Sequence, residues 1–159
     1  MKRNHALFIG LALIVALIDQ VSKWLALSHV APHQILSVIP GFFHIVLVKN
    51  RGMAFGILNQ TKPGFASIFL LATTIAAIGV IIFFFFWAKR NHRWLTIGLS
   101  LILGGAMGNL IDRIQLGYVI DFLDFFLADY HWPAFNMADS AVTVGTCWIL
   151  FNVIRGKSL

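Results

Sequence analysis

The acidic side chains of this sequence are all aspartates, and most of them lie in its last third. Six aspartates and no glutamate stand beside twelve lysines and arginines, and Asp112, Asp121, Asp124, Asp129 and Asp139 fall within 28 consecutive positions. Two close carboxylates cannot both ionise cheaply, so one of them keeps a proton. The ionised member can then take a proton from water while the protonated member polarises an amide. Such a pair would hydrolyse a peptide bond without a metal and without a covalent intermediate.

The same aspartates have a simpler interpretation as solvated loop charges or helix caps. We favour it for Asp124 and Asp129, because ordinary caps and loop charges need no further reason. Asp139 and Asn136 instead stand at the mouth of an apolar run. The residues alone do not decide whether Asp112 or Asp121 would be the partner of Asp139.

A second set of polar residues lies inside or beside apolar runs. Asp19 and Lys23 are four residues apart, so their side chains meet on one helical face. They can form a structural ion pair or contribute to a polar site, and both interpretations stay open. Asn109, Asp112 and Arg113 share one face by their spacing, where they could anchor a bundle or line a pocket.

The sequence lacks the residues that several other kinds of active site require. A His-Glu-x-x-His zinc site needs glutamate, and the sequence contains neither a Gly-x-Ser-x-Gly elbow nor a phosphate-binding Walker loop. We therefore expect no metal and no cofactor. Cys147 is the only cysteine, so it cannot form an internal disulfide, and we interpret it as a small buried apolar residue.

The composition predicts an integral membrane protein. Hydrophobic residues make up 59% of the chain, charged residues 11%, and the mean hydropathy is +0.85. A helix needs roughly 20 apolar residues to cross a hydrocarbon core about 30 Å thick. We expect one membrane-embedded domain, 1–159, with transmembrane helices at about 6–27, 65–87, 94–111 and 138–154 and long connections at about 28–64 and 112–137. Gly104 and Gly108 would let another helix approach the third span closely.

Basic residues predict the orientation of these spans. They flank the first and fourth spans and fill the short link between the second and third: Lys2, Arg3, Lys89, Arg90, Arg93, Arg155 and Lys157. By the positive-inside rule both termini are cytoplasmic and both long connections lie outside. The net charge of +6 is then largely a topology signal, and no nucleic-acid partner is expected. We interpret the first span as a retained helix, because it is longer than the apolar region of a signal peptide and contains Asp19.

The outer connections carry strand-like and interfacial patterns. "FHIVLVKNRGMAFGIL" places a turn-like segment between two apolar runs, which predicts a short hairpin or small sheet on the membrane. "LGYVIDFLDFFLADYHWPAF" is rich in aromatic residues, which favour an element at the outer interface.

Two functions of other classes also fit membrane-embedded aspartates. A small transporter or proton channel could use Asp19, Lys23, Asp112 and Asp139 as a relay. A noncatalytic membrane subunit could use its small-residue pair for helix pairing and would tolerate loss of its aspartates.

Five blocks resemble the signature blocks of lipoprotein signal peptidase, also called signal peptidase II. They are "DQVSKW" (19–24), "NRGMAFGIL" (50–58), "GGAMGNLIDR" (104–113), "GYVIDF" (117–122) and "PAFNMADS" (133–140), in family order across nearly the whole chain. The resemblance implies an all-α membrane protein of four transmembrane helices, with a small extracytoplasmic β-sheet cradle and an interfacial helix. The resemblance depends on the five blocks together and not on any single one. Neither the transporter nor the noncatalytic subunit explains all five blocks.

The resemblance also assigns roles to residues. It places the catalytic pair on Asp121 and Asp139, one as general base on water and the other as general acid. The positions that bind substrate or support the pair are Asn50, Gly52, Asn109, Asp112, Arg113, Asn136, Ala138, Asp19 and Lys23. From its place at the end of the third span, we expect Asp112 to hold Arg113 and the neighbouring loop.

The implied substrate is a prolipoprotein of the bacterial cytoplasmic membrane. The family cuts before a cysteine that carries a diacylglyceryl group, near the outer leaflet, and membrane lipid would contact the apolar faces beside the pocket. Inhibition by globomycin-type cyclic peptides is expected on the same ground.

Overall fold

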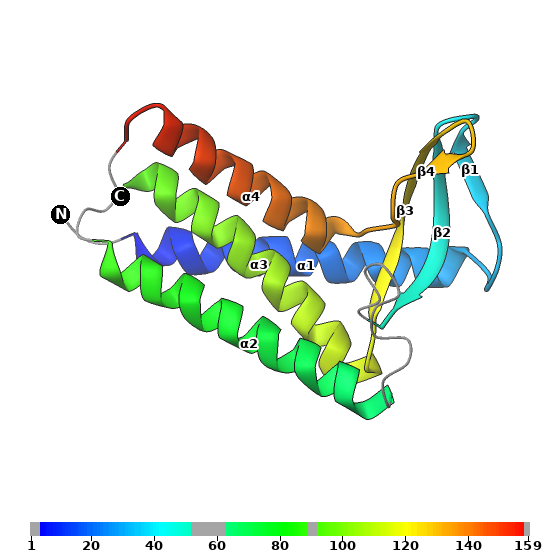
Figure 1. Ribbon diagram of the computed structural model, residues 1–159, viewed down its shortest axis with the longest axis horizontal. Coiled ribbons are helices and arrows are strands. Elements are labelled where there is room, and N and C mark those ends of the chain that lie inside the picture. Colours follow the sequence, from blue (N-terminus) through cyan, green and yellow to red (C-terminus); the bar gives the residue numbers. More distant parts are fainter. Residues whose placement is uncertain (1–3, 52–62, 89–91, 158–159) are drawn as a thin grey trace.

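In its described residues the chain forms four long helices and a small antiparallel sheet. The computed structural model describes residues 4–51, 63–88 and 92–157. Its elements in order are α1 (His5–His29), β1 (Leu36–Ile39), β2 (Phe43–Asn50), α2 (Pro63–Trp87), α3 (Arg93–Leu116), β3 (Val119–Leu127), β4 (Tyr130–His131) and α4 (Met137–Ile154). The helices lie side by side and the sheet stands at one end of them, while the first turn of α1 and the last turn of α4 lie at the other end (Figure 1).

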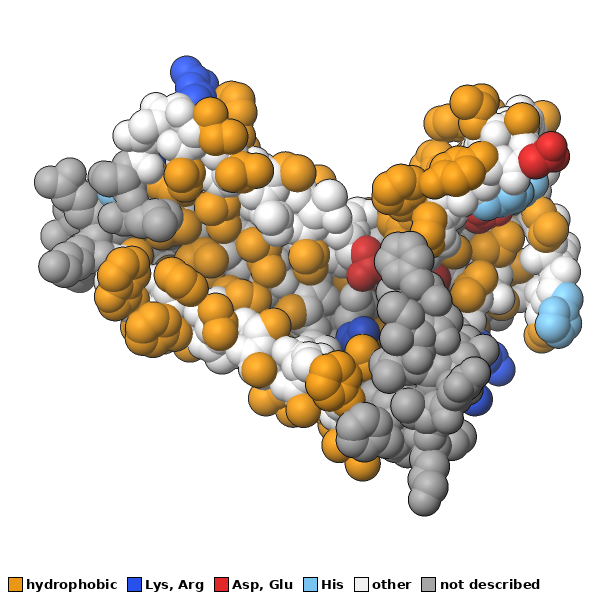
Figure 2. All heavy atoms as spheres, in the orientation of Figure 1, with side chains coloured by type: hydrophobic (Ala, Val, Ile, Leu, Met, Phe, Trp, Pro, Cys, Tyr) orange, Lys and Arg blue, Asp and Glu red, His pale blue; other side chains and the backbone are white. Residues whose placement is uncertain are grey.

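The helices are suited to a bilayer. All four are long and apolar enough to cross a membrane, which confirms the predicted fold class of four spans with a small sheet. Orange side chains cover much of the bundle surface (Figure 2). In the "IIFFFFW" end of α2, Phe83, Phe84 and Phe86 are exposed, whereas Phe85 is buried and stacks on Phe8 at 3.8 Å between ring centroids. Most of this aromatic run therefore faces lipid.

Helix α3 is the centre of the bundle. It contacts each of the other three helices and is the most buried of the four spans. A Cβ atom added to Gly104 would lie 2.6 Å from the carbonyl oxygen of Ala12, and one added to Gly108 would meet Asp19. The close helix approach predicted for this glycine pair is confirmed, and the partner helix is α1. A buried apolar core lies between α1, α2 and α3. It comprises Phe8, Ala12, Ile81, Phe85, Ala88, Trp94, Leu95, Leu99 and Leu103.

The sheet has the order β1-β2-β3-β4, and each neighbouring pair is antiparallel. In β2 and β3, Asn50 pairs with Val119 and Lys49 pairs with Ile120, while Asp121 lies opposite Val48. Successive side chains of a strand point to opposite faces. Asn50 and Asp121 therefore share one face, the Asp121 face, and Lys49 and Ile120 share the other, the Lys49 face.

The third helix is longer than its hydropathy predicts. It was expected at 94–111 but runs to Leu116 and ends at Gly117, which has a left-handed φ of 77°. Asp112 and Arg113 therefore belong to the helix, and not to an outer connection at 112–137. Polar residues normally signal the end of a span, but these are satisfied by partners on other elements, described below. The other helix bounds lie within two residues of the predicted ones.

Three further expectations differ from the structure or lie outside it. The aromatic-rich stretch forms β3 and β4, and the described ranges 4–51, 63–88 and 92–157 contain no interfacial helix. Strand β2 pairs with β1 and β3, whereas the second run of the expected hairpin, 53–58, lies outside the described residues. Cys147 is exposed and not buried, because it lies on a part of α4 that does not face the bundle.

We predict that Gly104→Ala destabilises the protein. The new methyl group would press on the backbone and on Val15 of α1, and overpacking of this kind costs about 1–3 kcal/mol. The measurement is the apparent melting temperature in detergent micelles.

Gly79→Ala in α2 is the matched control, because nothing lies within 4 Å of its added Cβ. Its melting temperature should stay the same or rise slightly, since alanine favours a helix over glycine. Equal melting temperatures for the two variants would contradict close packing at Gly104.

Candidate active site

The polar residues gather where the bundle meets the sheet. Figure 2 shows acidic side chains in red in the hollow between these two parts of the molecule. Asp121 comes from β3, Asp139 from α4, Asn109 from α3 and Lys23 from α1. Residues more than a hundred positions apart are thus brought to one place.

Asp121 is almost fully buried in the sheet. It is 1% exposed, and both of its carboxylate oxygens accept hydrogen bonds from amides. Asn136 Nδ2 donates to Oδ1 at 2.7 Å and Asn50 Nδ2 donates to Oδ2 at 2.8 Å. Burial raises the pKa of Asp121 to about 6, and the charge of Asp139 adds to this, although the two amide donors oppose it. Asp121 can therefore hold a proton near neutral pH.

Asp139 has a different environment in the first turn of α4. It forms a capping box with Asn136: its backbone N–H donates to Asn136 Oδ1 at 2.9 Å, and its Oδ2 accepts from the N–H of Asn136 at 3.3 Å. Asn109 Nδ2 donates to its Oδ1 at 2.8 Å. A helix N-terminus stabilises negative charge, and Asp139 is only partly buried.

Two asparagines connect the carboxylates. Asn136 Nδ2, which donates to Asp121, also lies 3.2 Å from Asn109 Oδ1, and Asn109 in turn donates to Asp139. Asn136 is itself fully buried. Asp121 and Asp139 therefore belong to one hydrogen-bonded cluster and interact electrostatically.

Lys23 lies beneath this cluster and is buried. Its Nζ is 2.8 Å from Asp19 Oδ2, 2.8 Å from Asp112 Oδ2 and 3.0 Å from Asn109 Oδ1. Because the oxygen of Asn109 faces the ammonium group, its NH₂ group faces Asp139. The other oxygen of Asp19 accepts from the N–H of Ala138 at 2.8 Å, at the start of α4. The Asp19–Lys23 pair is therefore both an ion pair within α1 and a support for the site.

Asp112 has partners other than the expected one. Its Oδ2 accepts from the N–H of Ile120 at 3.0 Å, so it does hold the chain that follows α3. Its ion pair, however, is with Lys23 and not with Arg113, because helix α3 turns it toward α1. Arg113 Nη1 donates to the carbonyl oxygen of Asn109 at 3.3 Å, and its guanidinium interacts most strongly with the charge of Asp139.

One residue of this cluster was not among the candidates. Gln20 Nε2 donates to Asp112 Oδ1 at 2.8 Å and to the carbonyl oxygen of Gly108 at 3.1 Å. The available signal was an amide inside an apolar span, next to Asp19. Gly52, which was a candidate, lies outside the described residues.

Asp124 was wrongly interpreted as a loop charge or cap. It is 8% exposed, accepts from His131 Nδ1 at 2.9 Å and lies 3.7 Å from His44 Nδ1. It points to the Lys49 face of the sheet, so it is separated from Asp121. Asp129 is exposed in the turn after β3, as expected for a loop charge.

In the part of the chain that the structure describes, the four residues of the supposed proton relay do not span the bundle. Asp19, Lys23, Asp112 and Asp139 lie together at the sheet end, and toward the other end the buried core on α1, α2 and α3 is apolar. The polar side chains Thr96 and Ser100 in that part of α3 bond to their own helix. Among the described residues, no group of three or more His, Cys, Asp or Glu is placed to hold a metal ion.

Four apolar helices and a carboxylate cluster at their sheet end define a multi-pass membrane protein with an enzyme-like polar site. Comparison with known families is consistent with this class: a model described as signal peptidase (SPase) II matches residues 11–155. The chain belongs to the signal peptidase II family and is thus a membrane peptidase.

The chain resembles known proteins over nearly its whole length. It is 42% identical over 155 residues to the lipoprotein signal peptidase of Syntrophus aciditrophicus, covering 98% of this chain and 96% of that one. It is 45% identical over 148 residues to that of Solibacter usitatus, covering 93% and 90%. A solved bacterial membrane enzyme superposes with a TM-score of 0.85 at 31% identity, over 98% of this chain and 97% of that one. The family resemblance of the five sequence blocks is confirmed.

We predict that Lys23→Met strongly destabilises the protein. The change leaves Asp19 and Asp112 buried without their cation, and breaking a buried ion pair from one side costs about 3–5 kcal/mol. Thermal unfolding in detergent measures the loss. Lys157→Met at the opposite end is the control, and an equally small effect of both changes would contradict the supporting role of Lys23.

Proposed function

We propose that this protein is an aspartic endopeptidase that removes the signal peptide from prolipoproteins, cutting before the diacylglyceryl-modified cysteine. One observation carries the mechanism: Asp121 and Asp139 meet in one hydrogen-bonded cluster while their surroundings differ. The names of the relatives support the substrate class.

The different surroundings of Asp121 and Asp139 suggest which carboxyl group is the general acid and which is the general base. Asp139, at a helix N-terminus with N–H donors, acts as general base and takes a proton from water. The water oxygen attacks the scissile carbonyl carbon, and buried Asp121 gives its proton to the carbonyl oxygen. The C–N bond of the tetrahedral intermediate then breaks as Asp139 passes its proton to the leaving nitrogen, and Asp121 recovers its own.

The neighbouring side chains would orient this pair and the substrate. Asn136 and Asn50 fix the plane of the Asp121 carboxyl group, and Asn109 fixes that of Asp139. The guanidinium of Arg113, near both aspartates, stabilises the negative charge that develops on the carbonyl oxygen. Lys23 and Asp19 support the pair indirectly: Lys23 orients Asn109, and Asp19 binds the N–H of Ala138 beside Asp139.

An apolar hollow beside Asp139 suits a lipid-bearing substrate. It is lined by Trp132, Phe135, Asp139, Ser140, Thr143 and Val144, from α4 and the segment before it. A substrate whose acyl chains stay in the bilayer could reach this hollow from the side, with its scissile bond at the sheet end. Membrane lipid occupies the same apolar faces when substrate is absent.

The location and the inhibitor class follow from the same proposal. The protein lies in the bacterial cytoplasmic (inner) membrane with both termini in the cytoplasm, which the basic residues at the end away from the sheet support. Globomycin-type cyclic peptides would inhibit it by occupying the substrate site.

We predict that Asp121→Asn and Asp139→Asn each lower the cleavage rate by at least about 100-fold, the usual contribution of a general acid or base. The assay is cleavage of purified, diacylglyceryl-modified prolipoprotein in detergent micelles with EDTA present. Each variant should keep the wild-type melting temperature to within a few degrees.

Asp129→Asn and Asp124→Asn are the matched controls, since one aspartate is exposed and the other faces away from the site. Loss of cleavage in Asp112→Asn with activity retained in Asp121→Asn would move the pair to Asp112 and Asp139. A wild-type enzyme that cuts only unlipidated substrate would refute the substrate class.

The pKa of Asp121 gives a pH prediction with a definite sign. Asp121 is protonated below about pH 6 and ionised above it. If it is the general acid, kcat/KM falls as pH rises through about 6, or somewhat above it when substrate displaces water. A rise in kcat/KM through the same range would instead make Asp121 the base and reverse the two roles.

A further inference from the structure

A second pocket lies on the Lys49 face of the sheet, away from the catalytic pair. It has a volume of about 470 Å³ and is lined by Leu27, Val30, Pro32, His33, Leu47, Val48, Lys49, Tyr118 and Ile120. Its walls come from the end of α1 and the segment that follows it, from β2, and from β3 with the residue before it, and the Lys49–Ile120 pair forms part of the sheet side. Asn50 and Asp121 point to the other face, so this pocket is not part of the active site.

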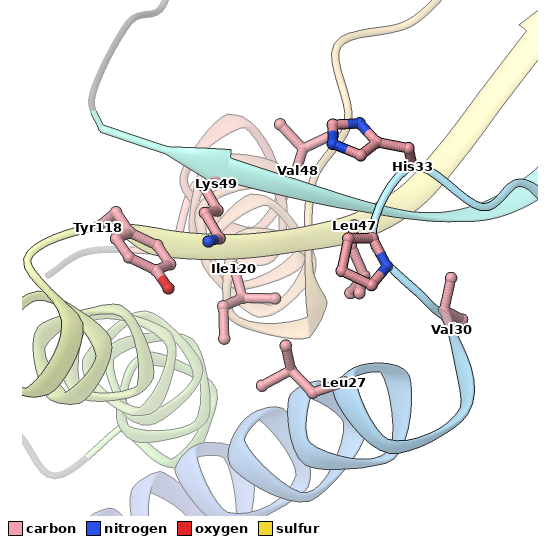
Figure 3. Close-up of a pocket in the computed structure, with 9 residues that line it drawn as sticks. Leu27, Val30, His33, Leu47, Val48, Lys49, Tyr118 and Ile120 are labelled. Carbon is pink, nitrogen blue, oxygen red and sulfur yellow. The ribbon is translucent and has the colours of Figure 1, made fainter.

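The walls of the pocket are mostly apolar, and its polar side chains are those of His33, Lys49 and Tyr118. Figure 3 shows Leu27 and Ile120 pointing toward one another across it, and the amine of Lys49 and the hydroxyl of Tyr118 on the same α1 side of the strands. Lys49 Nζ lies 5.4 Å from the centroid of the Tyr118 ring. Within the described part of the chain Lys49 forms no ion pair, and none of the lining residues is acidic. Among the described residues, the pocket thus offers the ammonium group of Lys49, which has no acidic partner there, with the hydroxyl of Tyr118 and the ring of His33, beside a hydrocarbon wall.

The position of the pocket places it at the membrane interface. Leu27 belongs to the last turn of α1, a membrane span that ends at His29. Tyrosine and lysine are typical of this level, where phospholipid phosphates lie. The ligand must therefore be amphipathic, with a single negative charge next to an apolar part.

We propose that this pocket binds one anionic phospholipid. Lys49 and the hydroxyl of Tyr118 donate to the phosphodiester, and the first methylene groups of an acyl chain lie against Leu27, Val30 and Ile120. The volume suits the glycerophosphate part of a lipid, since binding pockets for small molecules span about 300–1,000 Å³, while the rest of the chains stay in the bilayer.

The test is native mass spectrometry of the full-length protein, titrated with phosphatidylglycerol and with phosphatidylcholine of the same acyl chains. The wild type should retain one phosphatidylglycerol about tenfold more strongly than phosphatidylcholine, as expected for one charge-assisted contact. Lys49→Gln should abolish this preference and Tyr118→Phe should reduce it. Lys157→Gln should preserve it, although this lysine also lies over an aromatic ring, that of Trp94.

Three outcomes would overturn the proposal. Wild type could bind the two lipids equally, or Lys49→Gln could keep the preference while folded, as judged by its circular dichroism. Inorganic phosphate, added as its ammonium salt, could displace the lipid as effectively as more phosphatidylglycerol does, which would make this a free-anion site. If Lys49→Gln does not fold, Tyr118→Phe, which removes one oxygen atom, decides alone. Lipid binding here does not depend on peptidase activity, so failure of either proposal leaves the other standing.

Discussion

One buried ammonium group holds the active site together. Lys23 is shared by Asp19, Asp112 and Asn109, and it is 2% exposed. Each acceptor fixes something else: Asp19 binds the first turn of α4, Asp112 binds the first residues of β3, and Asn109 binds Asp139. A buried cation is costly unless several acceptors surround it, so these positions cannot shift independently. The elements that carry Asp121 and Asp139, the proposed catalytic pair, are thereby held in place against α1 and α3.

Sequence patterns predicted the parts of the molecule that depend on local order. Hydropathy located the spans, the four-residue spacing paired Asp19 with Lys23, and the glycine pair indicated where another helix approaches α3. Patterns failed where distant partners decide the outcome. Asn109, Asp112 and Arg113 looked like the end of a span, but the helix continues because α1 and β3 satisfy Asp112. Asp124 looked solvated because nothing in its own strand shows that His44 and His131 will flank it.

Residue type alone does not distinguish the two aspartates of the proposed pair. Their difference arises from secondary structure: Asp121 lies on a strand inside the cluster, whereas Asp139 belongs to a capping box at a helix N-terminus. Burial raises the pKa of the first, and backbone N–H donors face the second. One asparagine, Asn136, serves both, since its side chain donates to Asp121 and caps the helix that contains Asp139. The cap that starts α4 therefore also links the two aspartates.

The sheet gives this small enzyme two separate surfaces from the same two strands. Because side chains alternate, Asn50 and Asp121 point into the hydrogen-bonded cluster of the candidate site while Lys49 and Ile120 point to the opposite pocket. A one-residue slip between β2 and β3 would exchange these faces and abolish both sites. Asp112 opposes such a slip, because its bond to the N–H of Ile120 fixes β3 at the boundary between the two faces. The ammonium group of Lys23, which orients the Asn109 amide toward Asp139, is thus connected, through Asp112, to the register of the sheet itself.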